Sequence, residues 1–269
     1  MNRQASHSAK ASTSKEPTIH DVFESKTGTW QYVVADPSTL TAVIIDPVLD
    51  YDPATQVITT GMADALLSLV EENNYKVDRI LETHCHADHL SAASYLQNRL
   101  AQKQGHRPPI GIGKRIGNVQ RLFGQRYGVP EEEYEGVFVK LFDDDEAFSI
   151  GDLTATAIHL PGHTPDHLGY KIGDHVRIWT GHDYPPEERS APVPWISVRD
   201  HKMHNRHLKD GISEEEFVAL RKERDAKLGE PRLLHQSIQT NIRAGRLPKP
   251  KDAGHRLLHL PLKLKGVEW

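Results

Sequence analysis

Histidines and an aspartate are concentrated in one short segment of the sequence, which reads Thr83-His84-Cys85-His86-Ala87-Asp88-His89. The segment follows a predicted strand and precedes a predicted helix, so its side chains can converge on metal from a single loop. Imidazole together with carboxylate suits zinc or iron, whereas a structural thiolate site needs several cysteines. Burying such a cluster without a metal would be costly. The spacing therefore predicts a metal site.

The ligands of this segment divide into two predicted pairs. His84 and His86, two residues apart, can share one ion, and Asp88 and His89 can reach a second position beside it. Cys85 lies between two of the histidines, and we interpret it as a buried spacer in preference to a redox or persulfide-binding thiol. It is the only cysteine in the chain, which excludes an intramolecular disulfide.

Two later histidines occupy similar places, each directly after a predicted strand. His163 lies in a Pro-Gly-His-Thr turn, and His182 lies in a Gly-His-Asp-Tyr turn that also contains Asp183 and Tyr184. Each turn is a weak signal alone. Together with the first segment they predict one metal centre on loops at one edge of a sheet. Tyr184 is a candidate catalytic residue that could hydrogen-bond substrate, and a packed tyrosine is the alternative.

The elements that must position these residues alternate between strands and helices. Apolar and β-branched runs predict strands at 30–35, 41–45, 77–81, 137–142, 153–160 and 168–172. Helical spacing predicts helices at 63–75, 91–100 and 114–127. Ser213 and Glu216 form a capping box for a late helix with Phe217 and Leu220 on its apolar face. This pattern predicts one α/β domain over residues 18–262, with a disordered tail at 1–17 and a short tail at 263–269.

Composition excludes several classes of protein. The 269 residues carry 33 Lys and Arg against 37 Asp and Glu, so bulk charge gives no reason to expect nucleic acid as a partner. The longest apolar runs fall short of a transmembrane helix. The N-terminal segment lacks the apolar region of a secretory signal; it is rich in Ser and Ala, which is also compatible with an organelle transit peptide. We expect a cytoplasmic or mitochondrial protein that is not secreted.

The motifs resemble those of the metallo-β-lactamase superfamily. They are the His84-x-His86-x-Asp88-His89 segment and the turns at His163 and His182. The flanking residues 32–36, 44–48 and 80–92 look like the branch of persulfide dioxygenases and glyoxalase II, and most closely like the β-lactamase hydrolase-like proteins. The resemblance covers about residues 18–262. It implies an α/β fold, an αββα sandwich, with the metal in a cleft between the sheet edges.

The resemblance to persulfide dioxygenases implies one Fe(II) per chain. His84, His163 and a later aspartate would hold the iron, which leaves positions open for O₂ and the substrate sulfur. Asp88 and His89 would orient and tune these ligands. The expected reaction oxidises glutathione persulfide with O₂ to sulfite and glutathione. The partner is then a small-molecule glutathione derivative, without nucleic acid or membrane, and a homodimer is left open.

The resemblance to thioester hydrolases implies a second hypothesis, with two zinc ions per chain. A water between the two metals would be the nucleophile on a thioester or lactone. Six side chains would hold the zinc ions: His84, His86 and His163 at one metal, and Asp88, His89 and His182 at the other.

The sequence departs from the family pattern after the His163 turn. The family carries a ligand aspartate at the end of a strand between the two later turns, but here only residues 164–181 separate His163 from His182. The second half of the fold is therefore predicted to be shortened by an internal deletion that removes this aspartate. Asp183 or Asp174 would have to replace it. The alternatives are a product that cannot assemble the site and a catalytically silent relative with another role.

Overall fold

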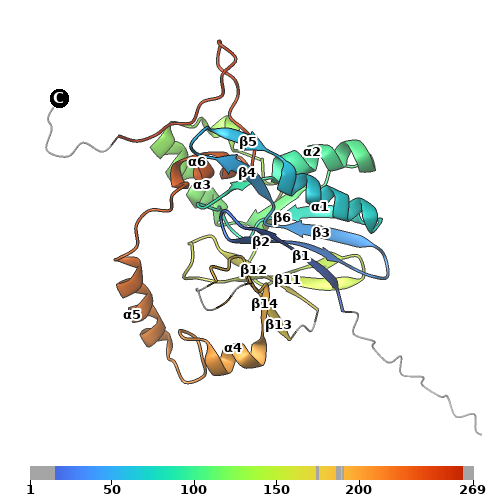
Figure 1. Cartoon of the computed structure of the whole chain (residues 1–269), viewed down its shortest axis with the longest axis vertical. Helices are drawn as coiled ribbons and strands as arrows, with labels where there is room; N and C mark the ends of the chain where they lie inside the picture. The colour runs from blue at the N-terminus through green and yellow to red at the C-terminus, as the bar shows by residue number, and fades with distance from the viewer. Residues whose placement is uncertain (1–15, 174–175, 186–188, 190, 263–269) are drawn as a thin grey trace, which may run out of the picture.

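A six-stranded sheet lies at the centre of the computed structural model, which describes residues 16–173, 176–185, 189 and 191–262 (Figure 1). The first three strands in spatial order pair antiparallel, and the later neighbours pair parallel. In spatial order the strands are β1 (Thr18–Glu24), β2 (Thr29–Ala35), β3 (Thr41–Ile45), β6 (Lys76–Leu81), β8 (Ile110–Gly113) and β9 (Lys140–Phe142).

Smaller antiparallel sheets complete the β structure. A three-stranded sheet contains β10 (Glu146–Ile150), β11 (Leu153–His159) and β12 (Leu168–Ile172). A second three-stranded sheet has the order β5 (Val57–Thr59), β4 (Val48–Asp52) and β7 (Leu90–Ser91). A two-stranded sheet pairs β13 (Arg177–Trp179) with β14 (Trp195–Ser197). The described strands after β12 are short, with three residues each in β13 and β14.

The helices divide between the sheet and an outer arc. α2 packs on β6 and β8, α1 packs on α2, and α6 packs on α3 and β7. α4 contacts β14, whereas α5 lies on an arc away from the central sheet (Figure 1). The bounds are α1 (Gly61–Glu72), α2 (Ala93–Gln104), α3 (Ile116–Tyr127), α4 (Val198–His204), α5 (Glu214–Asp225) and α6 (Leu234–Asn241), with a 3-10 turn at Glu131–Glu133.

Two apolar cores explain the layers. Successive strand side chains point to opposite faces, so Val33 joins a core with helix residues such as Leu66, while Val34 joins a core with Leu153 of the second sheet. β2 is therefore buried along its whole length. The chain forms the layered α/β sandwich that the sequence predicts.

Most predicted elements are confirmed, with differences at their ends. β2, β3, β6 and β12 match the predicted strands to within one residue, and α3 matches to within two at its start. The helix predicted at 63–75 ends at Glu72, because Asn74 has a left-handed φ of 55°. The strand predicted at 137–142 is limited to β9. β1 begins at Thr18, and most of both predicted tails, 1–15 and 263–269, lies outside the described residues.

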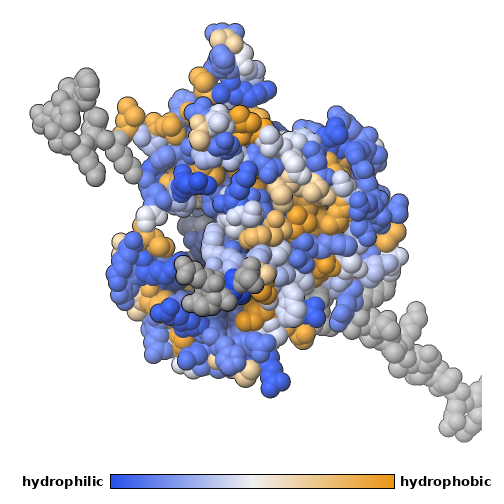
Figure 2. All heavy atoms as spheres, viewed as in Figure 1, coloured by the Kyte–Doolittle hydropathy of each residue, from blue (hydrophilic) through white to orange (hydrophobic). Residues whose placement is uncertain are grey.

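The late helix has the predicted start but not the predicted burial. Ser213 and Glu216 form both hydrogen bonds of the capping box. However, α5 has no buried side chain and Leu220 is 36% exposed, and the outer arc that includes α5 is mostly hydrophilic on the face shown in Figure 2. Phe217 instead lies beside Gly162, and Arg221 donates to the Gly162 carbonyl, so α5 contacts the turn that carries His163. None of the helices described is long and apolar enough to cross a membrane.

Candidate metal centre

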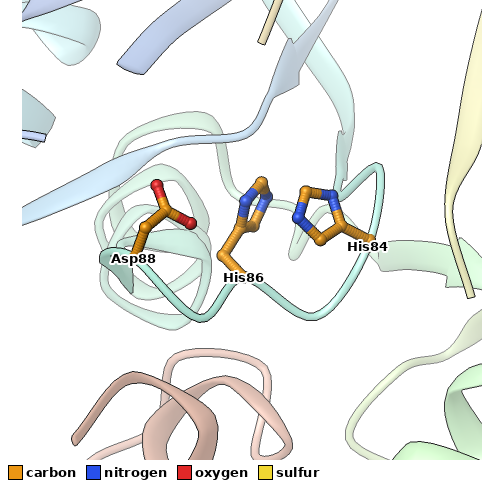
Figure 3. Close-up of side chains that lie close together, drawn as sticks. All are labelled: His84, His86 and Asp88. Atoms are coloured by element: carbon orange, nitrogen blue, oxygen red, sulfur yellow. The ribbon is translucent and has the colours of Figure 1, made fainter. Parts of the chain in front are cut away.

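The loop between β6 and β7 carries four candidate ligands. It begins where β3 and β6 end, and these neighbouring parallel strands place their carboxyl ends at one edge of the sheet. His84, His86 and His89 are at most 4% exposed, and Asp88 is partly exposed. Figure 3 shows His84, His86 and Asp88 projecting from the same side of this loop. Their ligand atoms lie within 4.8 Å of one another, as the sequence predicts for a metal site.

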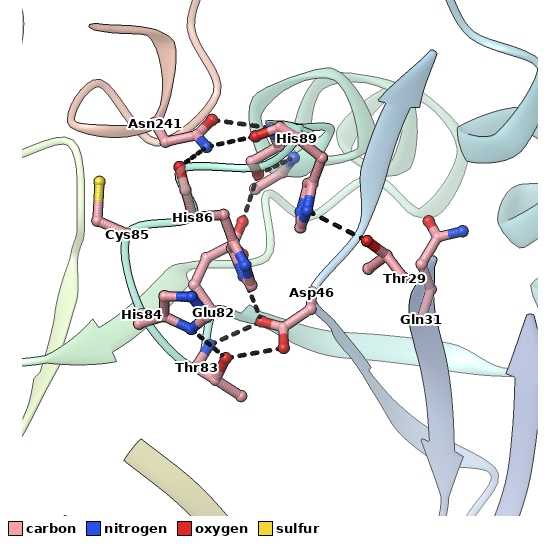
Figure 4. A network of polar contacts seen from close by, with 12 residues as sticks. Thr29, Gln31, Asp46, Glu82, Thr83, His84, Cys85, His86, His89 and Asn241 are labelled. Atoms are coloured by element: carbon pink, nitrogen blue, oxygen red, sulfur yellow. Dashed lines mark hydrogen bonds and ion pairs between the residues drawn. The ribbon is translucent and has the colours of Figure 1, made fainter. Parts of the chain in front are cut away.

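The hydrogen bonds of Thr83 determine which nitrogen of His84 is free. Thr83 Oγ1 donates to Asp46 Oδ2 at 2.8 Å and lies 2.9 Å from His84 Nδ1 (Figure 4). Since its single proton is used on Asp46, the hydroxyl must accept the Nδ1 proton of His84. The Nε2 lone pair of His84 is therefore available to a metal.

Two carboxylates favour the opposite tautomer in His86. Its Nε2 lies 3.0 Å from Asp46 Oδ1 and 3.3 Å from Glu82 Oε2, and both oxygens can only accept when ionised. Nε2 therefore carries the proton, and the buried Nδ1 has no partner among the described residues. Burial opposes the charged forms, but Asp46 and Glu82 hold the pKa of His86 above its usual value, and His86 holds the pKa of Asp46 below its own.

The turn after β11 brings His163 to His84. His163 Nε2 lies 3.2 Å from His84 Nε2, so two ring nitrogens face each other. Burial, followed by the neighbouring His167 and His182, lowers the pKa of His163 to about 4. Burial also lowers the pKa of His84 well below its usual value, so both rings are favoured in the neutral form that ligates metal. The ring of His167 also packs against His84, at 5.2 Å between ring centroids. The sequence prediction missed His167, although it lies only four positions after His163.

Asp88, His89 and His182 form a second set beside the first. Asp88 Oδ2 lies 3.2 Å from His89 Nδ1 and 3.3 Å from His182 Nε2. The Nε2 of His89 is buried and lacks a partner in the described part of the chain. The rings of His86 and His89 are 4.2 Å apart between centroids, so the two sets adjoin.

The other predicted site residues do not join this cluster. Asp183 Oδ1 pairs with Arg189 and Asp183 Oδ2 accepts the backbone amide of Val193 at 2.7 Å, so both oxygens are engaged elsewhere. Tyr184 is 68% exposed and stacks on His182, at 6.0 Å between ring centroids. Asp174 lies outside the described residues.

Two buried polar side chains, to which the sequence alone assigns no role, hold the loop in place. Asn241, at the end of α6, donates to the carbonyls of His86 and His89 and accepts from the Ser91 amide, each at 2.8 Å. Asp166 Oδ2 accepts the Cys85 amide at 2.8 Å. Cys85 is 3% exposed, so the predicted spacer role matches its position. The loop is therefore held from both sides.

These observations fit a metal centre. His86 Nδ1 and His89 Nε2 are buried ring nitrogens without partners in the described chain, which costs free energy unless a ligand satisfies them. The Nε2 atoms of His84 and His163 face each other, and a proton or a cation between them would satisfy both lone pairs. Asp46 and Glu82 behind His86 form the carboxylate–histidine support typical of metal sites. The donor set suits zinc and iron.

Comparison with known proteins agrees with this geometry. Residues 26–182 match the Metallo-beta-lactamase superfamily. The chain belongs to the metallo-beta-lactamase superfamily. Two solved structures show the same fold. ETHE1 from Myxococcus xanthus matches with a TM-score of 0.63 and 20% sequence identity, over 85% of this chain and 100% of that chain. A metallo-beta-lactamase from Staphylococcus aureus matches with a TM-score of 0.59 and 15% sequence identity, over 85% of this chain and 72% of that chain.

Relatives within the metallo-beta-lactamase superfamily carry different names. A Beta-lactamase hydrolase-like protein of Xylella fastidiosa is 35% identical over 94% of this chain and 67% of its own length. Glyoxylase B2 of Dictyostelium discoideum is 34% identical over 90% of this chain and 96% of its own length. The mitochondrial Persulfide dioxygenase ETHE1 of Bos taurus is 26% identical over 61% of this chain and 51% of its own length. Both metallo-hydrolase-type and persulfide dioxygenase-type functions are thus plausible, and metal binding is supported.

Proposed function

We propose that this chain is a dinuclear metal-dependent hydrolase of thioesters. The observation that carries the proposal is the pair of adjoining donor sets, each of which contains a buried ring nitrogen without a partner in the described chain. His84, His86 and His163 would hold one metal, and Asp88, His89 and His182 the other. The 34% identity to Glyoxylase B2 over most of both chains supports this class of reaction.

The division of work follows from the contacts of these residues. When bound, the metals would polarise a carbonyl group and lower the pKa of a water molecule. Asp46 and Thr83 orient His86 and His84 for the first metal. Asp88 contacts both histidines of the second set and would hold the second metal together with them.

The proposed substrate is a glutathione thioester, the class that the sequence resemblance implies. Tyr184 is exposed and stacked on His182, so its ring lies at the edge of the metal centre where a substrate would enter. We propose that Tyr184 contacts the substrate there. This role does not require its hydroxyl to ligate metal.

Metal content and hydrolysis test the proposal together. Protein purified without added metal is analysed for zinc and iron, then assayed for release of glutathione from a glutathione thioester. We expect about two zinc ions per chain and hydrolysis. The variant His182→Gln should lose one metal and the activity, whereas His20→Gln, a histidine on β1, should keep both. A two-zinc protein without hydrolysis would refute the proposed reaction, and a folded chain without metal would indicate a catalytically silent relative.

Persulfide dioxygenation is the second candidate, and a specific observation favours it. The donor atoms of His84, His86 and Asp88 lie within 4.8 Å of one another, and two histidines with one carboxylate are typical of non-haem Fe(II) oxygenases. The same elemental analysis separates the candidates. About one iron per chain, with O₂ consumption and sulfite release on glutathione persulfide, would support the dioxygenase and contradict the hydrolase.

A further inference from the structure

Thr29 contacts both histidines of the second donor set. It is the first residue of β2 and is fully buried. Its Oγ1 lies 3.4 Å from His89 Nδ1 and 3.3 Å from His182 Nδ1. Figure 4 shows the contact with His89. One hydroxyl thus lies against the outer nitrogen of two histidines that are 93 positions apart in the chain (182 − 89).

The backbone brings His182 to this position. Trp30 N donates to the Gly181 carbonyl and Asp183 N donates to the Gly28 carbonyl, each at 2.9 Å. These bonds form an antiparallel bridge between Thr29 and His182. The contact between Thr29 and His182 therefore follows from main-chain pairing and not from a single side-chain rotamer.

A short chain of hydroxyl groups leads away from Thr29 to a carboxylate. Thr29 Oγ1 lies 2.8 Å from Thr27 Oγ1, and Thr27 Oγ1 donates to Glu24 Oε2. Glu24 is 5% exposed and also accepts the backbone amides of Lys26 and Thr27, each at 2.8 Å. Since Thr27 uses its only proton on Glu24, it can only accept from Thr29.

We infer that Glu24, Thr27 and Thr29 form a relay that fixes His89 and His182 in the tautomer with the proton on Nδ1. Thr29 donates to Thr27, so its remaining lone pairs accept the Nδ1 protons of both histidines. Asp88 Oδ2, 3.2 Å from His89 Nδ1, favours the same tautomer of His89, but it also lies 3.3 Å from His182 Nε2 and favours the opposite tautomer there. Thr29 is therefore the group that draws the His182 proton to Nδ1. With both protons on Nδ1, the Nε2 lone pairs of the two histidines are available to a metal, and His89 Nε2 is the buried nitrogen without a described partner.

The relay makes Thr29 a positioning residue for the second metal of the proposed function. The matched variants are Thr29→Val, which keeps the shape and removes the hydroxyl, and Thr29→Ser, which keeps the hydroxyl. In a zinc titration against a chelator, Thr29→Val should bind the second zinc about 10–100-fold more weakly. The first zinc should bind as in the wild type, and Thr29→Ser should keep both affinities. Equal second-site affinity in Thr29→Val and wild type would overturn the inference.

The tautomers themselves are measured on metal-free protein, which separates the relay from the proposed function. Long-range ¹H–¹⁵N correlation spectra distinguish Nδ1–H from Nε2–H, and His89→Gln and His182→Gln assign the two signals. We expect Nδ1–H for both residues in wild type and Thr29→Ser. In Thr29→Val, His89 should keep Nδ1–H because Asp88 still accepts that proton, whereas His182 should change to Nε2–H, which Asp88 accepts. Nε2–H at His182 in the wild type would overturn the inference. If Thr29→Val does not fold, Thr27→Val serves instead, because it frees the Thr29 proton to point at a histidine. A chain that binds one zinc would refute the dinuclear function, while these spectra still decide the relay.

Discussion

Thr83 links the carboxylate of Asp46 to His84 through two hydrogen bonds. In Asp46→Asn, an amide N–H can replace the carboxylate oxygen that faces Thr83 Oγ1. The hydroxyl would then accept from the new side-chain amide and donate to His84 Nδ1, which moves the His84 proton onto Nε2. We expect zinc to bind the first donor set about 10–100-fold more weakly in a chelator competition.

A double variant provides the control for this change. Thr83→Val removes the hydroxyl, so in Asp46→Asn with Thr83→Val the reversed bond to His84 no longer forms. The double variant should therefore recover part of the zinc affinity lost in Asp46→Asn. Wild-type affinity in Asp46→Asn would contradict the proposed direction of the bond between Thr83 and His84.

Cys85 should be chemically inert in the folded protein. It is 3% exposed, and burial, with help from Asp166 and Glu82, raises the pKa of its thiol well above the ordinary value, so little thiolate forms. A disulfide reagent at pH 7 should label it only after denaturation in urea. Rapid labelling of the native protein would instead support the redox or persulfide-binding role.

At the scale of elements, α6 stabilises the metal loop through one side chain. In Asn241→Ala, the carbonyls of His86 and His89 and the Ser91 amide lose their partner. A buried unsatisfied group costs about 1–3 kcal/mol, so the free energy of unfolding in urea should fall by at least ~2 kcal/mol. Gln236→Ala on the same helix is the control, because its side-chain oxygen has no described partner. Equal losses in both variants would show that Asn241 acts only through the helix.

The candidate ligands are easier to recognise in the sequence than the side chains that contact them. His84, His86, Asp88 and His89 lie within six residues, so their spacing alone indicates a shared site. Thr29 and Asn241 are single ordinary residues on distant elements, and only the folded chain brings them to the loop. The strands were predictable because β2 and β3 are mostly apolar and β-branched, whereas α6 has only eight residues and a mixed sequence.

For the whole molecule, metal and stability should be coupled. Both donor sets draw on loops of the central sheet and on the turns at His163 and His182, so metal that binds only the folded chain stabilises all of them. Each site adds about 2.7 kcal/mol when free zinc is a hundredfold above Kd. Tm should rise with zinc and fall with EDTA. The double variant His84→Gln with His182→Gln should show no shift, and an unchanged wild-type Tm would contradict a metal centre in the native fold.

The bond between Asn241 and the His86 carbonyl spans 155 positions in the chain. During synthesis, the histidine loop leaves the ribosome long before α6 does. For that interval its carbonyls have no amide partner from Asn241, and His182 has not yet reached Thr29. The nascent chain therefore exposes the candidate metal-binding histidines before Asn241 can hold them in place. We expect selective metal binding only after α6 has packed against the histidine loop.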